Sequence, residues 1–394
     1  MPFPRVLLRL IAPLIALAIV SGVAIAGEAP SDRLPADYWQ RPLRPQGDAP
    51  SEWTTVEKSL APTDCGSCHA QQYKDWQLSR HSQAFSPGLV GELVGMDATG
   101  IRICMSCHAP LAEQLQTFLH EFTGQVPNPA PMLSPSFGNG CPSCHVRAWK
   151  HYGPPTRTGE TGTLFSPIHG GAQLSTDFER SEFCSGCHQF PMSAAVNSKP
   201  LENTYAEWKD SRFAAEGRTC QSCHMPDRRH LWRGIHDRTM VSAGVTAKID
   251  TTAQEVRFSV TNTAVGHDFP TYVTPRVILW AVPFDQDGKL LFPHAVHYTI
   301  ERQVEATATG WIERSDTRLA PGHSATLTLP WGDYENARVW MQVEPDSYYN
   351  RQIYSQMLQD SNTDDAAKNL IAIADQAAGA SLFRLFETVV HRPR

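Results

Sequence analysis

The sequence predicts an α+β chain of 394 residues, in which a region of short helices and loops precedes a β-sandwich-like region and C-terminal helices. Three observations support this prediction. All ten cysteines lie in the first of these regions, where periodicity is weak. Residues 241–345 carry the alternation typical of strands, and residues 346–394 carry helical periodicity.

The overall composition excludes two broad classes of protein. The chain is 41% hydrophobic and 19% charged, as expected of a globular protein. Its mean hydropathy of -0.33 excludes a polytopic membrane protein. The formal net charge of -6 and the lack of a long basic block argue against a nucleic-acid partner.

Residues 1–26 are predicted to be a signal peptide. Arg5 and Arg9 supply a positive start, residues 11–20 an apolar core, and residues 24–26 (Ala-Ile-Ala) a cleavage site. The alternative is an uncleaved membrane anchor, but the apolar core is shorter than the roughly 20 residues that a spanning helix needs. Cleavage would remove two arginines and no acid, so the mature chain would be more acidic.

Residues 27–62 form a proline-rich lead-in. Six prolines and little periodicity predict an extended segment that lies against the following region.

The ten cysteines form five Cys-x-x-Cys-His motifs. This spacing is the attachment signature of haem c, in which both thiols bond to the porphyrin and the histidine binds iron. Zinc sites do not require a histidine after every second cysteine, and cysteines this close pair mainly in redox motifs, so both alternatives fit less well. The motifs are Cys65/Cys68/His69, Cys104/Cys107/His108, Cys141/Cys144/His145, Cys184/Cys187/His188 and Cys220/Cys223/His224.

Residues 63–240 are therefore predicted to be a pentahaem cytochrome c domain with five covalently bound haems c. So few residues separate consecutive motifs that the porphyrins must themselves form much of the core. Covalent haem attachment in bacteria takes place outside the cytoplasmic membrane. With the signal peptide, this predicts a periplasmic or extracellular location.

Residues 241–345 are predicted to form a haem-free β-sandwich-like domain. Strands are expected near residues 256–260, 277–282, 325–329 and 338–343, with a hairpin turn at 285–288 that leads into a strand at 290–292.

Residues 346–394 are predicted to be a helical segment, because residues 348–360 and 365–390 carry a helical pattern.

Eleven histidines remain as candidates for the distal side of the five irons. His81 follows His69 by twelve residues in a helix-like segment, which separates the two by about 18 Å along a helix. We therefore expect His81 to reach a neighbouring haem. His120 and His236 follow their own motifs by the same interval.

Local sequence ranks the other candidates. His169 lies in a glycine-flanked loop, His230 and His236 in an arginine-rich stretch suited to haem propionates, and His267 at a turn where the strand region could reach the haems. The predicted distal ligands are His81, His169, His230 and His236, with His120 and His267 as two further candidates for the remaining iron. Ranked below them are His151, His294, His297, His323, His391 and the rival ligand Met225, which lies too close to its own motif.

The first motif, followed by Trp76-x-x-Ser79-x-His81, resembles the first unit of a multihaem cytochrome family. Its type member is the tetrahaem cytochrome that accepts electrons from hydroxylamine oxidoreductase. The resemblance covers about residues 60–240 and implies that His81 ligates another haem, with haems stacked in near-parallel and perpendicular pairs. The fifth motif and the long haem-free C-terminal part depart from that family. Residues 266–270 (Gly-His-Asp-Phe-Pro) are also similar to a short segment of polymerising extracellular cytochromes.

These features favour an electron carrier over an enzyme. Two-sided histidine ligation suits electron transfer, whereas an open iron invites substrate chemistry. Pentahaem nitrite reductases also carry five haems, but they use a lysine as the proximal ligand of the catalytic haem. All five motifs here end in histidine. The alternatives are a reductase or oxidase of small nitrogen or sulfur compounds with one open haem, and a subunit of an extracellular cytochrome filament.

The expected partners are redox proteins with basic docking patches, because the chain is acidic. A membrane quinol-oxidising enzyme or another oxidoreductase is a candidate partner, and oligomerisation is compatible with the sequence.

Overall fold

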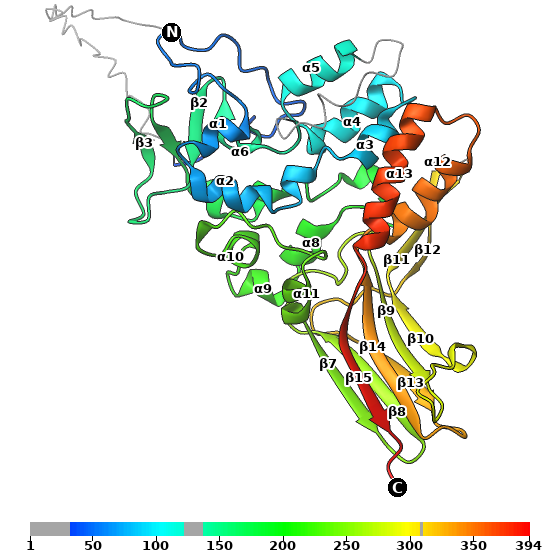
Figure 1. Ribbon diagram of the computed structural model, residues 1–394. Coiled ribbons are helices and arrows are strands. Elements are labelled where there is room, and N and C mark those ends of the chain that lie inside the picture. Colours follow the sequence, from blue (N-terminus) through cyan, green and yellow to red (C-terminus); the bar gives the residue numbers. More distant parts are fainter. Residues whose placement is uncertain (1–31, 122–136, 308–309) are drawn as a thin grey trace, which may run out of the picture.

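The computed structural model describes residues 32–121, 137–307 and 310–394. The signal peptide predicted over residues 1–26 lies outside these residues. Helices and loops form one end of the molecule, and long strands extend from it to the C-terminus (Figure 1). Within the described residues no helix is long and apolar enough to cross a membrane.

The cysteine-rich region consists of short helices and small strand pairs. Capping side chains fix several helix starts, as where Asp97 accepts a hydrogen bond from the amide of Gly100 at 2.8 Å. The helices are α1 (Pro62–Gly66), α2 (Ala70–Gln77), α3 (Pro87–Leu93), α4 (Ala98–His108), α5 (Ala112–Glu121), α6 (Cys141–His145), α7 (Glu182–Ser185), α8 (Thr204–Lys209), α9 (Arg212–Ala215), α10 (Cys220–His224) and α11 (Arg238–Gly244). The strands are β1 (Val146–Arg147), β2 (Lys150–Gly153), β3 (Gly162–Leu164), β4 (Ala172–Leu174), β5 (Ala195–Val196) and β6 (Lys199–Pro200).

The described part of the lead-in lies against this region. Tyr38 and Leu43 are buried, and the hydroxyl of Tyr38 donates to the carbonyl of Cys144 at 2.6 Å. The lead-in is therefore part of the packing around the third motif.

Two antiparallel sheets form the strand region. One has the order β10-β9-β14-β15 and the other β13-β8-β7, with a separate β11-β12 pair. Their inner residues share one hydrophobic core, in which Phe258, Leu279 and Val339 are fully buried. The strands are β7 (Val245–Thr251), β8 (Glu255–Asn262), β9 (Arg276–Pro283), β10 (Val296–Ile300), β11 (Arg302–Thr307), β12 (Gly310–Asp316), β13 (Ser324–Pro330) and β14 (Asn336–Glu344).

The predicted hairpin differs in its second strand. The turn at 285–288 forms, with Gly288 at a φ of 80°, but Leu290 makes only an isolated bridge to Phe284. Pro293 follows within a short 3-10 helix, Phe292–His294, and the strand that pairs with β9 is β10. Because proline cannot donate a backbone hydrogen bond to a neighbouring strand, the pairing with β9 begins after Pro293, at Val296 in place of the predicted residues 290–292.

The prediction of a helix over residues 365–390 is wrong in its last part. Helix α12 spans Ser355–Gln359 and α13 ends at Ala380, after which Phe383–His391 forms β15 and pairs with β14. This segment is rich in aromatic and β-branched residues, and pairing with β14 satisfies its backbone at the sheet edge.

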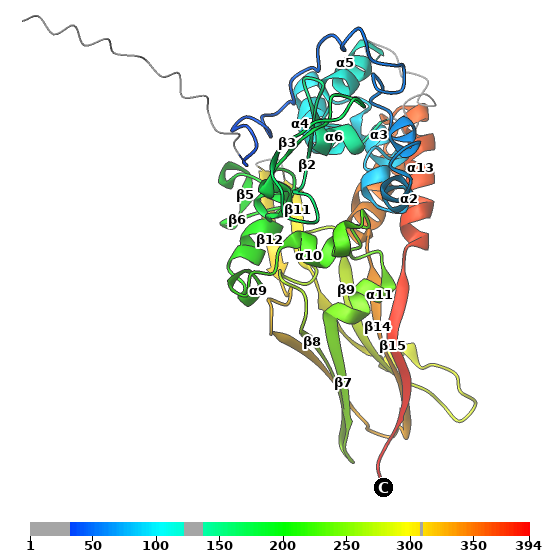
Figure 2. The same ribbon diagram turned by 90° about the vertical axis from the view of Figure 1, so that its left-hand side faces the viewer.

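Helix α13 (Asp365–Ala380) packs on α3, far from it in sequence (Figure 2). Leu370 joins a buried cluster with Phe85, Leu93 and Phe118. The C-terminal part of the chain is thus shared between the two regions. The predicted α+β class, with a helix and loop region and a β-rich region, is confirmed.

Candidate functional site: five haem-attachment motifs and their histidines

Each of the five motifs lies on a helical turn. The second, third and fifth lie wholly within α4, α6 and α10, and in the other two the histidine amide donates to the carbonyl of the first cysteine. Residues three apart share a helix face, so both sulfurs of a motif point to one side. All ten cysteines are free, which leaves every thiol available for a porphyrin.

Three motif histidines face a second imidazole at almost the same separation. Two imidazoles on one iron should have centroids about 6.2 Å apart, from metal–nitrogen bonds of about 2 Å and a ring radius of about 1.1 Å. The observed distances match this value. The pairs are His188 with His81 at 6.3 Å, His145 with His230 at 6.2 Å, and His224 with His267 at 6.3 Å.

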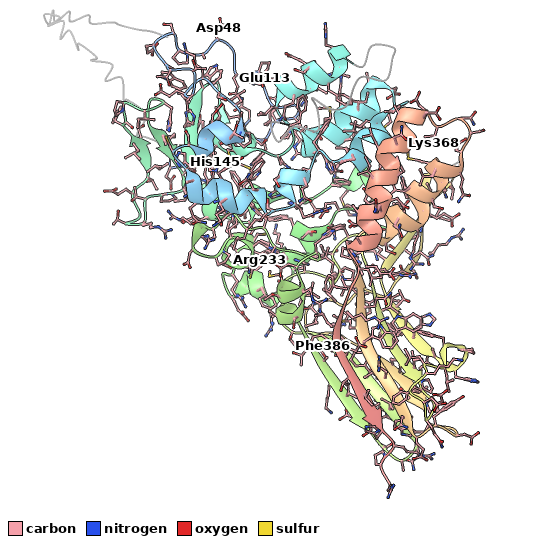
Figure 3. All side chains as sticks on the ribbon, in the orientation of Figure 1. Asp48, Glu113, His145, Arg233, Lys368 and Phe386 are labelled. Carbon is pink, nitrogen blue, oxygen red and sulfur yellow. The ribbon has the colours of Figure 1, made fainter. Side chains whose placement is uncertain are left out.

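Backbone carbonyls orient most of these rings. A carbonyl can only accept, so a ring whose Nδ1 lies next to one carries its proton there and leaves Nε2 unprotonated for a metal. His145, labelled in Figure 3, donates from Nδ1 to the carbonyl of Tyr152 at 2.8 Å. The same contact occurs from His108 to Ala84, His224 to Arg233, His230 to Arg228, His267 to Asp268 and His169 to Gly171, at 2.6–3.1 Å.

Burial keeps three of the paired imidazoles neutral. Desolvation, followed by the charges of His188, His224 and His230, lowers the pKa of His81 to about 3. Desolvation also lowers the pKa of His145 and of His224 to about 4. A neutral imidazole is the form that binds a metal, so His81, His145 and His224 are in the ligating state at neutral pH.

The first motif has two histidines nearby. The rings of His151 and His169 lie 4.1 Å apart, too close to hold an iron between them. Burial, then the charges of His169 and His69, lower the pKa of His151 to about 4, so His151 lies close to His69. His169, at a φ of 39°, is fixed by its amide hydrogen bond to Glu57 at 2.9 Å. His151, ranked low on sequence, is thus a neighbour of this motif.

The second motif has a different environment. His108 is exposed, and it belongs to none of the three imidazole pairs found at 6.2–6.3 Å among the described residues. His120 lies exposed in the last turn of α5.

The prediction that His236 is a distal ligand conflicts with its contacts. Its Nε2 lies 2.9 and 3.0 Å from the two carboxylate oxygens of Asp346 and therefore donates to them. That nitrogen carries a proton and has no lone pair for iron. In the same arginine-rich stretch, His230, six residues earlier, is the histidine that faces a motif histidine, His145.

Four lower-ranked histidines lie away from the motifs in the β-rich region. His297 stacks on Trp280 and His294 on Tyr334, while His391 contacts Asn336 and His323 follows a turn.

The motifs contact one another through their cysteines. Thiols of different motifs lie close enough to shift each other's pKa: Cys65 of the first motif with Cys141 of the third, Cys107 of the second with Cys187 of the fourth, and Cys184 of the fourth with Cys220 of the fifth. These sulfurs stand where thioether sulfurs would be after haem attachment. Sequence spacing does not reveal this order, because two of the three contacts pair motifs that are not consecutive in the chain.

Four of the predicted haem-binding cysteines, Cys68, Cys104, Cys144 and Cys223, take no part in these three contacts. Cys68 is exposed, and its sulfur lies 3.8 Å from the hydroxyl of Ser67. The sulfur of Cys223 is half-buried and lies 3.5 Å from Nη2 of Arg218. Cys68 and Cys223 are the second cysteines of their motifs, and each contacts its own local segment.

Arg41 of the lead-in joins two motifs. Its Nη1 lies 2.6 Å from the sulfur of Cys107, and its Nη2 lies 2.8 Å from that of Cys187. The sequence analysis had no signal for this residue beyond its place in a proline-rich segment.

Comparisons with known proteins agree with this site. Residues 64–146 match the family model described as cytochrome c554 and c-prime. A penta-heme cytochrome c552 from Thermochromatium tepidum is similar in structure, with a TM-score of 0.53 and 17% identity, over 77% of this chain and 95% of that one. At that identity the likeness shows the fold alone. No curated protein matches the chain.

Together with the motifs, these findings support a multihaem cytochrome c with covalently bound haem and a role in electron transfer.

Proposed function

We propose that this chain is an exported pentahaem c-type cytochrome that transfers electrons between redox partners through a continuous haem array. The observation that carries the proposal is the set of three imidazole pairs at 6.2–6.3 Å, the separation expected when one iron lies between two rings. When bound, haem supplies one-electron redox chemistry, and two histidine ligands keep its iron low-spin and suited to electron transfer.

The axial histidines are proposed site by site. The motif histidines His69, His108, His145, His188 and His224 are the proximal ligands, and the ten motif cysteines hold the porphyrins. The proposed distal ligands are His230 for the third haem, His81 for the fourth and His267 for the fifth. For the first haem, His169 is favoured over its neighbour His151, because its Nδ1 donates to a carbonyl and leaves Nε2 for iron.

Cys68 and Cys223, the second cysteines of the first and fifth motifs, remain part of this proposal. Cys68 and Cys223 are three residues from Cys65 and Cys220, so each lies on the same face of its helical turn as the cysteine that contacts a neighbouring motif. A thiol that is exposed or half-buried is accessible to a porphyrin during attachment. The proposed role of both residues is therefore the second thioether bond of the first and of the fifth haem.

The contacts between motifs support a connected path. Thiol contacts link the first motif to the third, the second to the fourth, and the fourth to the fifth. Charge interactions between Cys144 and both cysteines of the fourth motif link the third to the fourth. The resulting order is first, third, fourth and fifth, with the second attached to the fourth.

The surface charge supports basic redox proteins as partners. The chain carries 40 acidic against 34 basic side chains, and haem propionates and signal-peptide cleavage both add to the acidic balance. The proposed site of action is the periplasm or the cell exterior. A partner related to hydroxylamine oxidoreductase is part of the same proposal. This part rests on the match of residues 64–146 to the cytochrome c554 and c-prime family model.

Electron paramagnetic resonance (EPR) and optical redox titration of the purified holoprotein test the proposal. We expect five haems per chain, with at least the three sites that have facing imidazoles giving low-spin signals. Fewer than five haems, or high-spin signals from more than two, would contradict it.

A second candidate function is supported by the second motif. His108 lacks a facing imidazole among the described residues and is exposed, so a haem attached there has an open side for a small molecule. The candidate is a reductase or oxidase of small nitrogen or sulfur compounds. Carbon monoxide titration of the reduced protein decides between the two. One carbon monoxide adduct per chain would favour the enzyme. If no adduct forms and all five haems are low-spin, only the electron-carrier function is supported.

A further inference from the structure

The proposed distal ligand of the fifth haem comes from the β-rich region, not from the region that carries the motifs. His267 lies between β8 and β9, and its ring faces that of His224 at 6.3 Å with the planes inclined by only 11°. The position of this one imidazole therefore depends on how the loop between these strands is held against the haem-binding part of the chain.

On the β side, a buried asparagine and a backbone bridge hold the loop. Asn262 is fully buried, and its Nδ2 donates to the carbonyls of His267 at 2.9 Å and of Leu319 at 2.8 Å. Phe269 and Leu319 exchange two backbone hydrogen bonds of 2.9 Å. These contacts fix the shape of the loop, but they do not attach it to the haem-binding part.

Arg318 provides that attachment. Its side chain is 1% exposed and contacts both parts of the chain at once. On the haem-binding side, Nη1 donates to Oε1 of Glu207, in α8, at 2.8 Å. On the loop, the same nitrogen donates to the carbonyl of Thr271, and Nη2 lies 3.3 Å from Oδ2 of Asp268, the residue that follows His267. Two further bonds of 2.9 Å to Asp316 fix the plane of the guanidinium.

Helix α8 connects this cluster to the haem sites. Glu207 accepts from the hydroxyl of Thr271 at 2.7 Å and from the amide of Asp268 at 3.3 Å. Two residues earlier, the amide of Tyr205 donates to the carbonyl of His188, the histidine of the fourth motif. Helix α8 therefore connects the two: Tyr205 bonds to the fourth motif, and Glu207, two residues later in the same helix, bonds to Arg318 and to the loop that carries His267.

We propose that Arg318 is a positioning residue that holds His267 opposite His224, so that the haem-free β-rich region completes the coordination of the fifth haem. This inference rests on the proposed function, because it assumes a haem at the fifth motif with His267 as its distal ligand. It gives the β-rich region a role at the redox centres in addition to its own fold.

The test compares the spin states of variants of the full-length holoprotein. His267→Ala provides the reference, and should convert one haem from low-spin to high-spin in EPR. Arg318→Gln should convert the same haem in a large fraction of molecules, since the loop loses its charged link to α8 and keeps only the hydrogen bonds that Glu207 accepts from Thr271 and Asp268. Added imidazole should restore the low-spin signal in both variants. Arg318→Lys keeps the charge but not the planar fork, so we expect a smaller fraction of high-spin haem.

Arg302→Gln is the matched control. Arg302 is also a buried arginine of the β-rich region, bonded to Glu313 at 2.8 Å and to carbonyls of β5 and β6, but it does not touch the loop. This variant should keep the low-spin signal of the fifth haem. If both arginine variants lose it, the effect is a general loss of docking, and Arg318 has no specific role.

Glu207→Gln covers the case in which Arg318→Gln does not accumulate. It leaves Arg318 paired with Asp268 and Asp316 and weakens only the link to α8, so we expect a folded protein with a partly high-spin fifth haem. Unchanged low-spin signals in the Arg318 or Glu207 variants, beside a converted His267→Ala, would overturn this inference alone. Five unchanged haems in His267→Ala would instead overturn the proposed ligation of the fifth haem.

Discussion

The imidazole of His81 faces that of His188, with their centroids 6.3 Å apart and their planes inclined by 49°. His81 begins the short 3-10 helix His81–Gln83, shortly after α2, which ends at Gln77, yet the histidine that it faces belongs to the fourth motif. Helix α2 carries the chain away from the first site and delivers the ring to a different one. A histidine that follows one motif thereby lies at another motif, and distant parts of the chain meet there.

Replacing His81 should affect one haem only. We expect His81→Ala to convert the haem of the fourth motif from low-spin to high-spin, or to a replacement ligand, while the remaining spectra stay unchanged. EPR of the oxidised protein measures this. His236→Ala is the control, because its Nε2 donates to Asp346 and is not available to iron. A spin change in the control, or none in His81→Ala, would contradict the assignment.

Arg41 should raise the potentials of the second and fourth haems, because a fixed positive charge disfavours the oxidised form. Two unit charges about 8 Å apart interact by about 2 kcal/mol at an effective dielectric constant of 20, or about 90 mV for one electron. We expect Arg41→Gln to lower two potentials by several tens of millivolts in a spectroelectrochemical titration. Arg44→Gln is the control, since Arg44 is exposed and pairs only with Asp37 and Gln40 in the described structure. Equal shifts in both variants would count against a specific role of Arg41.

Truncation of Leu370 should destabilise the contact between α13 and the haem-binding region. Leu370 is 5% exposed in the cluster with Phe85 and Phe118, and removing a buried leucine side chain typically costs about 2–5 kcal/mol. We expect Leu370→Ala to unfold at a clearly lower denaturant concentration, followed by far-UV circular dichroism, with all haems still attached. Ile373→Ala, on the exposed face of the same helix at 55% exposure, should change little. Similar midpoints for the two variants would refute the role of α13 in this packing.

Export should be visible in the intact mass. We expect the mature chain to begin at Gly27 and to carry five haem additions, since residues 1–26 have the features of a cleaved signal and five motifs are present. Electrospray mass spectrometry of the holoprotein measures both. A mass that retains residues 1–26, or that lacks a haem, would contradict the prediction.

Electron exchange should depend on ionic strength. With more acidic than basic side chains, the protein should attract a basic redox protein through a field that salt screens within about 10 Å at 0.1 M. Stopped-flow rates with a small basic redox protein should fall steeply as salt is added. With an acidic one they should rise or stay level. The same salt response with both partners would exclude charge steering.

The sequence by itself determined the features that depend on a few neighbouring residues. Both cysteines and the histidine of a motif such as Cys220–His224 lie within one helical turn, so their spacing alone indicates haem attachment. Alternating residues of β8 likewise identify a strand, because the side chains of a strand point alternately to its two faces. Local periodicity gave the wrong answer for β15. Its residues carry a helix-like pattern, but they form a strand because they pair with β14.

Only the tertiary structure decided which distant groups meet. His230 and His236 share one arginine-rich stretch, yet the first faces His145 and the second donates to Asp346, which lies far along the chain. The loop of His267 reaches its position through Arg318 and Glu207, and no local pattern links these two residues. A distal imidazole is set by the packing of remote segments, and sequence spacing carries no information about that packing. The sequence therefore predicts the cysteines and the proximal histidine of each site, whereas the tertiary fold decides which histidine lies on the distal side.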